Sequence, residues 1–241
     1  MEIVMTVEEY FNELKLMEEQ YGREEDIYPW IYMMLKMSEN KCKGLSLRDV
    51  HNLKRPRNEE HKIEMFLRQG VGAPDFAYVS NGEVVGCVEI KAGSFHKNFQ
   101  RNGEIKFSVK AKKKYEVGRK NKINVEEWIY NKVPSLKIEK PNQLLGHLEK
   151  YRKVIFTNGK VFYFFALIST NGENMSAKIL ELANFEETYN DFIDKGRYDN
   201  NANEEWKKLK QCINKIKWSD TNEKVIKELE AILNKHTNDK E

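Results

Sequence analysis

The longest apolar run of the chain, residues 161–168, is the feature that most restricts the fold. It includes four consecutive aromatic residues at 162–165. The run is much shorter than the roughly twenty residues that a membrane-spanning helix needs, and a short apolar run of this kind fits a strand that is buried on both faces. Such a strand needs a covering layer on each side. The sequence therefore predicts a central sheet with helices packed against it.

Two Asn-Gly pairs predict tight turns between neighbouring strands. Asn81-Gly82 separates a strand expected over 75–80 from one over 83–91, and Asn158-Gly159 separates 154–158 from 161–169. Because two-residue turns join antiparallel neighbours, each pair predicts a hairpin. Alternating apolar residues predict two further strands, at 63–67 and 177–182.

Helical patterns lie before, between and after these strands. Thr6 and Glu9 form a capping box that opens a helix to about residue 20. Further helices are expected at the following residues: 25–37, 141–151, 185–195, 203–217 and 221–235. Residues 41–61 are polar and basic, which is typical of a loop with at most one short helix. The expected fold is α/β, with a mixed sheet flanked by helices.

Composition narrows the class of protein. A chain of 241 residues that is 40% hydrophobic and 11% aromatic can bury a sizeable core, and its net charge of +3 does not by itself indicate a nucleic-acid or membrane partner. The three cysteines are widely spaced and contain no CxxC pair, which argues against a disulfide framework and a zinc site. With no signal peptide or membrane span expected, a reducing cytoplasm is the expected location.

Two acidic residues and a lysine are expected to converge at one end of the first hairpin. Asp75 begins one strand, and Glu89 and Lys91 end the next. Side chains alternate along a strand, so Glu89 and Lys91 project from one face. The antiparallel turn brings the start of one strand beside the end of the other. Carboxylates in this arrangement can bind Mg²⁺, which promotes phosphodiester hydrolysis.

The tripeptide Glu-x-Lys is not informative alone, since it also occurs at Glu13 and Glu60. The copy at Glu89 differs because it ends an apolar strand whose hairpin partner begins with Pro74-Asp75. A structural explanation is also open: the charges could emerge at a solvated sheet edge as a cross-strand ion pair, worth less than about 1 kcal/mol.

Pro74-Asp75 and Glu89-Ile90-Lys91 resemble the PD-(D/E)XK nuclease superfamily, whose restriction-endonuclease-like core has the order αβββαβ. Glu25, before the sheet, looks like the family's helix glutamate, and Gln143 looks like the glutamine that opens the helix after the sheet. Residues 155–160 are similar to a segment in nuclease portions of restriction-modification enzymes. The resemblance covers about residues 20–168. It departs from the family in the roughly fifty residues between Lys91 and Gln143, where the crossover is usually short.

The resemblance implies a role for each matching residue. Asp75, Glu89 and the backbone carbonyl of Ile90 would bind Mg²⁺ or Mn²⁺. Lys91 would position or help to deprotonate the attacking water and stabilise charge at the phosphate. The candidate catalytic residues of the hairpin are therefore Asp75, Glu89 and Lys91.

Two further candidates come from the flanking helices. Glu25 would hold a second metal ion or its water, with Glu24 as an alternative. A glutamate in a first helical turn is also favoured by the helix dipole alone. Gln143 would contact a phosphate or Lys91, although glutamine is ordinary near a helix start.

One block of the chain, residues 97–122, is strongly basic. It has ten Lys and Arg against two acids, interleaved with aromatic residues. Charge runs are commonly solvated segments, but this one follows the strand with the candidate metal site, and its composition suits a phosphate backbone. The candidate nucleic-acid-binding residues are Lys106, Lys110, Lys112, Lys113, Lys114 and Arg119.

These patterns lead to the hypothesis of a Mg²⁺-dependent or Mn²⁺-dependent endonuclease, with DNA favoured over RNA, from a restriction or other defence system. The expected organisation is a nuclease core over 1–184 with a basic insertion at about 93–140, followed by a helical extension over 185–241 that caps the core or forms a dimer face. The alternatives are an RNase, a nuclease that needs DNA ends, and a non-catalytic nucleic-acid-binding protein. A homodimer and a separate methyltransferase or other partner stay open.

Overall fold

The computed structural model describes residues 5–20, 23–39, 45–50, 72–91, 102–117, 122–130, 141–197 and 199–238. The strand expected over 63–67 and the candidate residue Arg119 lie outside these ranges. The described helices are α1 (Val7–Glu19), the 3₁₀ helix η1 (Glu24–Ile27), α2 (Tyr28–Glu39), α4 (Pro141–Tyr151), α5 (Glu186–Lys195), α6 (Asn200–Lys215) and α7 (Asn222–Asn238). The strands are β1 (Leu45–Asp49), β2 (Phe76–Ser80), β3 (Glu83–Ile90), β4 (Asn102–Val117), β5 (Lys122–Tyr130), β6 (Lys153–Thr157), β7 (Val161–Asn171) and β8 (Asn174–Asn184).

The strands follow one another across a mixed sheet in the order β1-β2-β3-β6-β7-β8-β4-β5. The β3–β6 pair is parallel, and the other pairs are antiparallel. β5 pairs only with the outer half of β4, so the main sheet has the first seven strands. The predicted α/β class, a mixed sheet flanked by helices, is confirmed.

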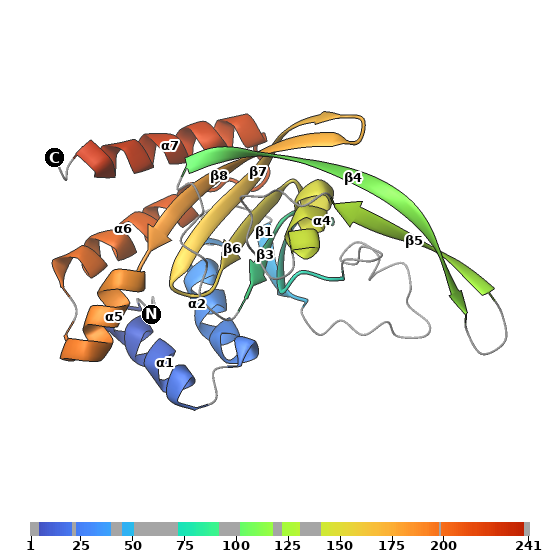
Figure 1. The fold of residues 1–241 in the computed structure, drawn as a ribbon. Helices are drawn as coiled ribbons and strands as arrows, with labels where there is room; N and C mark the ends of the chain where they lie inside the picture. Colours follow the sequence, from blue (N-terminus) through green and yellow to red (C-terminus); the bar gives the residue numbers. More distant parts are fainter. Residues whose placement is uncertain are drawn as a thin grey trace.

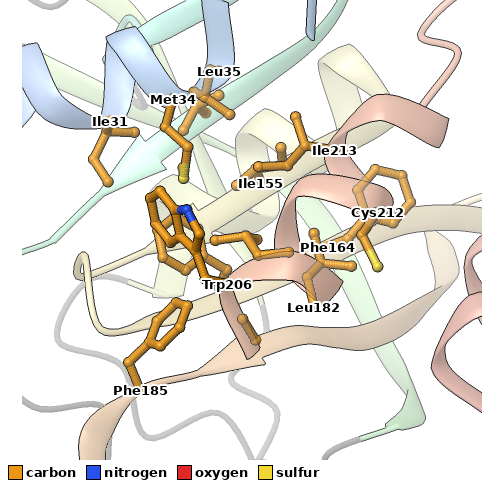
Figure 2. Close-up of a cluster of buried hydrophobic side chains, with 14 of the residues drawn as sticks. Ile31, Met34, Leu35, Ile155, Phe164, Leu182, Phe185, Trp206, Cys212 and Ile213 are labelled. Atoms are coloured by element: carbon orange, nitrogen blue, oxygen red, sulfur yellow. The ribbon is translucent and has the colours of Figure 1, made fainter. Parts of the chain in front are cut away.

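Helices cover both faces of the sheet (Figure 1). The first face packs against α1, α2 and the three C-terminal helices in one large apolar cluster. Figure 2 shows part of this cluster, to which Met34 of α2, Trp206 of α6 and Phe164 of β7 contribute. The second face carries a separate apolar cluster with α4. The sheet is therefore the middle layer between one helix and a group of several.

The apolar run of β7 is buried on both faces, as its sequence predicts. Residues 161–167 are all buried, and they alternate between the two clusters: Phe162 and Phe164 join the first, and Tyr163 and Phe165 the second. None of the described helices is long and apolar enough to cross a bilayer.

Both predicted Asn-Gly hairpins are present. Asn81 and Gly82 have φ angles of 51° and 81°, which the two central residues of a type I′ turn require. The capping box of Thr6 and Glu9 is also present at the start of α1. These features depend on local sequence alone, and they bring β3 back alongside β2.

Three strands, β1, β4 and β5, are not predicted by the sequence patterns. Residues 45–49, expected in a loop, form β1 and pair antiparallel with β2. The segment has only two apolar residues, of which Leu47 is buried, so its alternation is too short to stand out. In the basic block, β4 alternates buried Ile105, Phe107 and Val109 with polar residues. Because β4 is rich in lysine, this alternation is difficult to recognise in the sequence.

The C-terminal helices are attached to the sheet by apolar and polar contacts. The apolar stripe of α6 and α7, including Trp206, Leu209 and Leu229, is buried in the first cluster. Lys153 of β6 donates a hydrogen bond to the Trp218 carbonyl at 2.9 Å, and Asn222 donates one to the Leu167 carbonyl at 2.6 Å. The stripe is thus covered within a single chain.

Candidate functional site

The two hairpin carboxylates lie side by side in the interior. Asp75 directly precedes β2, and the antiparallel register, which pairs Phe76 with Val88, continues to bring Asp75 next to Glu89. Val88 and Ile90 pack into the first apolar cluster, so the alternating Glu89 projects toward the α4 face. The exposed fraction is 7% for Asp75 and 0% for Glu89. They do not form a solvated sheet edge.

Asp75 is held by two short hydrogen bonds. The Tyr28 hydroxyl donates to Oδ1 at 2.6 Å, and the backbone N–H of Ile90 donates to Oδ2 at 2.6 Å. Tyr28 begins α2, and its hydroxyl oxygen also lies 3.2 Å from Glu24 Oε1. Burial and the neighbouring Asp75 raise the pKa of Tyr28, so the phenol remains a donor. The carboxylate of Asp75 is therefore fixed in one orientation.

Burial raises the pKa of Asp75 to about 7, and the negative charge of Glu89 adds to this effect. The hydrogen bonds from Tyr28 and Ile90 and the charge of Lys91 act in the opposite direction but do not offset it. Asp75 therefore retains a proton to higher pH than an exposed aspartate does. A bound cation would relieve the repulsion between these two carboxylates.

Glu89 contacts two basic side chains without making a well-aligned hydrogen bond to either. Lys91 Nζ lies 2.6 Å from Oε1, and His147 Nε2 lies 3.1 Å from Oε2. Neither Glu89 oxygen has a partner with hydrogen-bond angles, and the same holds for both ring nitrogens of His147. Buried polar atoms without hydrogen bonds are costly and uncommon, and they often mark a functional site.

Lys91 Nζ lies among oxygen atoms of three residues. Besides Glu89, it donates to the Ile90 carbonyl at 2.8 Å and approaches Glu24 Oε1 at 3.5 Å. Burial acts to lower the pKa of Lys91, but the charges of Glu89 and its other acidic neighbours raise it overall. The lysine is therefore an ammonium ion at neutral pH.

The oxygen atoms of this site fit a small divalent cation. Buried carboxylates and a backbone carbonyl are the ligands that Mg²⁺ and Mn²⁺ prefer. The Glu89 and Ile90 oxygens already surround one positive charge, that of Lys91. In the part of the chain that the structure describes, no group of three or more His, Cys, Asp or Glu side chains is arranged to hold a metal ion. A cation at these residues would therefore need the carbonyl or water as further ligands.

Of the two glutamates considered before α2, Glu24 is the one in contact with Lys91 and Tyr28. Glu25 is exposed and lines a neighbouring surface pocket together with Tyr28, Pro29, Tyr32, Asp49 and Phe76. Tyr28 separates this pocket from Asp75, because its ring lines the pocket while its hydroxyl binds the carboxylate.

Gln143 and His147 lie one turn apart on α4, the helix that packs against β3. Gln143 is partly buried, and His147 has an exposed fraction of 0%. His147 is not among the candidate residues that the sequence pattern identifies. The available signal was a histidine four residues after Gln143 on an otherwise apolar helix face.

Four of the candidate nucleic-acid-binding lysines, Lys110, Lys112, Lys113 and Lys114, lie where β4 and β5 form a long two-stranded ribbon, whereas Lys106 lies in the inner part of β4 that pairs with β8. Lys106 and Lys110 are exposed on β4, and Lys112, Lys113 and Lys114 occupy its outer half. From Val109 to Val117, β4 pairs with β5 in nine consecutive register positions, whereas β8 pairs only with its inner half. Figure 1 shows this ribbon extending beyond the main sheet, with β5 returning toward α4. The ribbon therefore connects to the helix that carries His147.

The site thus brings together two buried carboxylates, a charged lysine and a buried histidine from β2, β3 and α4. It can bind a cation, orient a water molecule and stabilise negative charge. Comparisons of the chain with protein-family models, with curated proteins and with solved structures find no match.

Proposed function

We propose that this protein is a metal-dependent nuclease that hydrolyses phosphodiester bonds in DNA, cutting within the strand. The observation that carries the proposal is the pair of buried carboxylates of Asp75 and Glu89 beside the partly buried Lys91 on one hairpin, with the Glu89 oxygens lacking aligned partners. In the alternative interpretation, a cross-strand ion pair at a solvated sheet edge, these carboxylates would be exposed. This group resembles the site of PD-(D/E)XK nucleases, which supports the reaction class.

Asp75, Glu89 and the Ile90 carbonyl are the residues that would hold Mg²⁺ or Mn²⁺. When bound, such an ion supplies Lewis-acid stabilisation of phosphate charge and lowers the pKa of water. Tyr28 and the Ile90 N–H keep the Asp75 carboxylate in place. The ammonium of Lys91 is positioned to donate a hydrogen bond to a water or a phosphate oxygen, and it would stabilise negative charge there.

The β4–β5 ribbon supports nucleic acid as the substrate. Exposed Lys106 and Lys110 add positive charge to its strand, and three more lysines follow along β4. A two-stranded antiparallel ribbon has the width that the major groove of duplex DNA admits. Duplex DNA is therefore favoured over RNA, whose major groove is deep and narrow.

The first test is a cleavage panel of supercoiled, linear and single-stranded DNA and RNA, each with Mg²⁺, Mn²⁺ or EDTA. The variants are Glu89→Gln and Lys91→Met. Each should lower the cleavage rate by at least about a hundredfold, because each removes a group that acts on the reacting phosphate. Matched controls are Glu204→Gln and Lys207→Met, which change an exposed pair on α6.

Metal-dependent cutting of DNA that is lost in both site variants and kept in both controls would support the proposal. Cutting of RNA alone would favour the RNase alternative. Tight DNA binding with no cleavage under any condition would replace the enzyme with a binding protein.

A further inference from the structure

The strongest unexplained feature of the site is a pair of buried groups without hydrogen bonds. Glu89 and His147 both have an exposed fraction of 0%, and four of their polar atoms lack a partner with hydrogen-bond angles: Oε1 and Oε2 of Glu89, and Nδ1 and Nε2 of His147. Leaving such atoms without hydrogen bonds in the interior costs about 1–3 kcal/mol each, and the ion pair with Lys91 offsets part of this cost at Oε1 only. A cation bound by Oε2 and a ring nitrogen would remove part of the remaining cost.

The spacing of the facing atoms suits two ligands of one metal ion. His147 Nε2 and Glu89 Oε2 are 3.1 Å apart. Two ligands at adjacent corners of an octahedron, each with a bond of about 2.1 Å, lie about 3.0 Å apart. The two atoms are therefore at this distance, but they are not aligned for a hydrogen bond to each other. Such an arrangement is expected when both atoms point toward one metal ion.

A cation held by this pair would not compete with the lysine for the same carboxylate oxygen. Lys91 contacts the other carboxylate oxygen, Oε1, so a cation at Oε2 leaves this ion pair in place. His147 is held on α4 between apolar residues of the second cluster, including Leu144 and Leu148, and its ring lies 5.7 Å from that of Tyr151. The imidazole is therefore fixed next to the carboxylate by the packing of α4.

We propose that His147 Nε2 is a ligand of the divalent cation bound by Glu89, which makes the centre a mixed nitrogen and oxygen site. This inference rests on the metal site of the proposed function. Mg²⁺ favours an all-oxygen shell, whereas imidazole is a good ligand for divalent transition ions. The site therefore selects Mn²⁺ over Mg²⁺.

The test uses the full chain, stripped of metal by chelation and then loaded with Mn²⁺. Pulsed electron paramagnetic resonance detects a ¹⁴N nucleus bonded to Mn²⁺ through its modulation of the spin echo. The wild type should show ¹⁴N modulation, and His147→Gln should lose it while retaining bound Mn²⁺. His236→Gln is the matched control, since His236 lies on α7 and contacts Gln211.

Calorimetric titration gives a second readout. The wild type should bind Mn²⁺ at least about tenfold tighter than Mg²⁺, and His147→Gln should weaken Mn²⁺ binding by about tenfold and Mg²⁺ binding by much less. A merely structural histidine would weaken both ions equally, and that result would overturn the proposal. Should His147→Gln fail to fold, the wild-type spectrum decides alone, since a ligated His147 must give ¹⁴N modulation there.

Bound Mn²⁺ without ¹⁴N modulation in the wild type, or modulation that survives in His147→Gln, would also overturn the proposal. These outcomes are independent of cleavage. Metal-dependent cleavage without a nitrogen ligand would support the proposed nuclease function and contradict the role of His147 as a ligand. A nitrogen-ligated Mn²⁺ in a protein that cleaves no substrate would support the role of His147 and contradict the nuclease function.

Discussion

At the scale of single residues, the acid–base state of Asp75 decides how the site responds to pH. The pKa of Asp75 is raised by burial from 3.8 to about 7 in the folded protein. The folded state therefore retains a proton that the unfolded state has released between pH 4 and pH 7. The contribution of the Asp75 carboxyl group to the free energy of unfolding is therefore largest below about pH 4. It falls as pH rises to about 7, by at most about 4 kcal/mol.

Asp75→Asn should remove this pH dependence because the amide does not ionise. In EDTA, the free energy of unfolding of the wild type should fall between pH 5 and pH 8 by clearly more than that of Asp75→Asn. Urea unfolding at several pH values measures the difference, with Asp194→Asn on the exposed part of α5 as control. Equal pH slopes for the wild type and Asp75→Asn would contradict the raised pKa.

At the scale of elements, the β4–β5 ribbon is the part best placed to bind a polyanion. Phosphate contacts from lysines release counterions, so each contact contributes about 0.9 to the slope of log Kd against log salt. Lys106→Gln combined with Lys110→Gln should weaken duplex binding and lower this slope by about 1.8. Fluorescence anisotropy in EDTA measures binding without cleavage.

The control for the ribbon is Lys207→Gln combined with Lys215→Gln, which removes the same charge from exposed positions of α6. A general effect of net charge would lower the slope equally in both double variants. That result would show that the ribbon does not bind DNA. A decrease in the slope that is confined to the β4 variant would show that these lysines contact phosphates.

At the scale of the whole molecule, the C-terminal segment is packed against the strand that carries Glu89. Gly86 of β3 lies directly under the Trp218 ring, where a Cβ atom would overlap the indole. Trp218 in turn stacks on Tyr78 of β2 with 4.0 Å between ring centroids. The helical extension and the β2–β3 hairpin therefore share one core.

Gly86→Ala should destabilise the protein by about 1–3 kcal/mol, because the added methyl group cannot be accommodated beneath the tryptophan. Combined with Trp218→Leu, which opens space at that point, it should cost less than the sum of the two single changes. Urea unfolding of the four proteins measures this coupling. Simple additivity would show that the extension and the hairpin do not depend on each other through this contact.

Local sequence predicted the centre of the site well. Asp75, Glu89 and Lys91 lie on one hairpin, whose two-residue turn depends on Asn81 and Gly82. A register shift between Tyr78 and Val79, which the sequence does not reveal, then places Asp75 opposite Glu89. The helices at α4 and at the C-terminus follow from apolar periodicity. These features depend on residues that are close together in the chain, so the local sequence is sufficient to predict them.

The partners of that centre were decided by contacts between distant parts of the chain. Tyr28 reaches Asp75 across 47 residues, and His147 meets Glu89 only because α4 packs on the second face of the sheet. β1 and the β4–β5 ribbon likewise depend on strand partners that weak local alternation does not identify. The sequence alone determined the layered α/β class and the carboxylate–lysine group, because short-range periodicity and turn geometry specify them. Only the tertiary structure decided which tyrosine, glutamate and histidine surround that group, because long-range packing has no local sequence pattern.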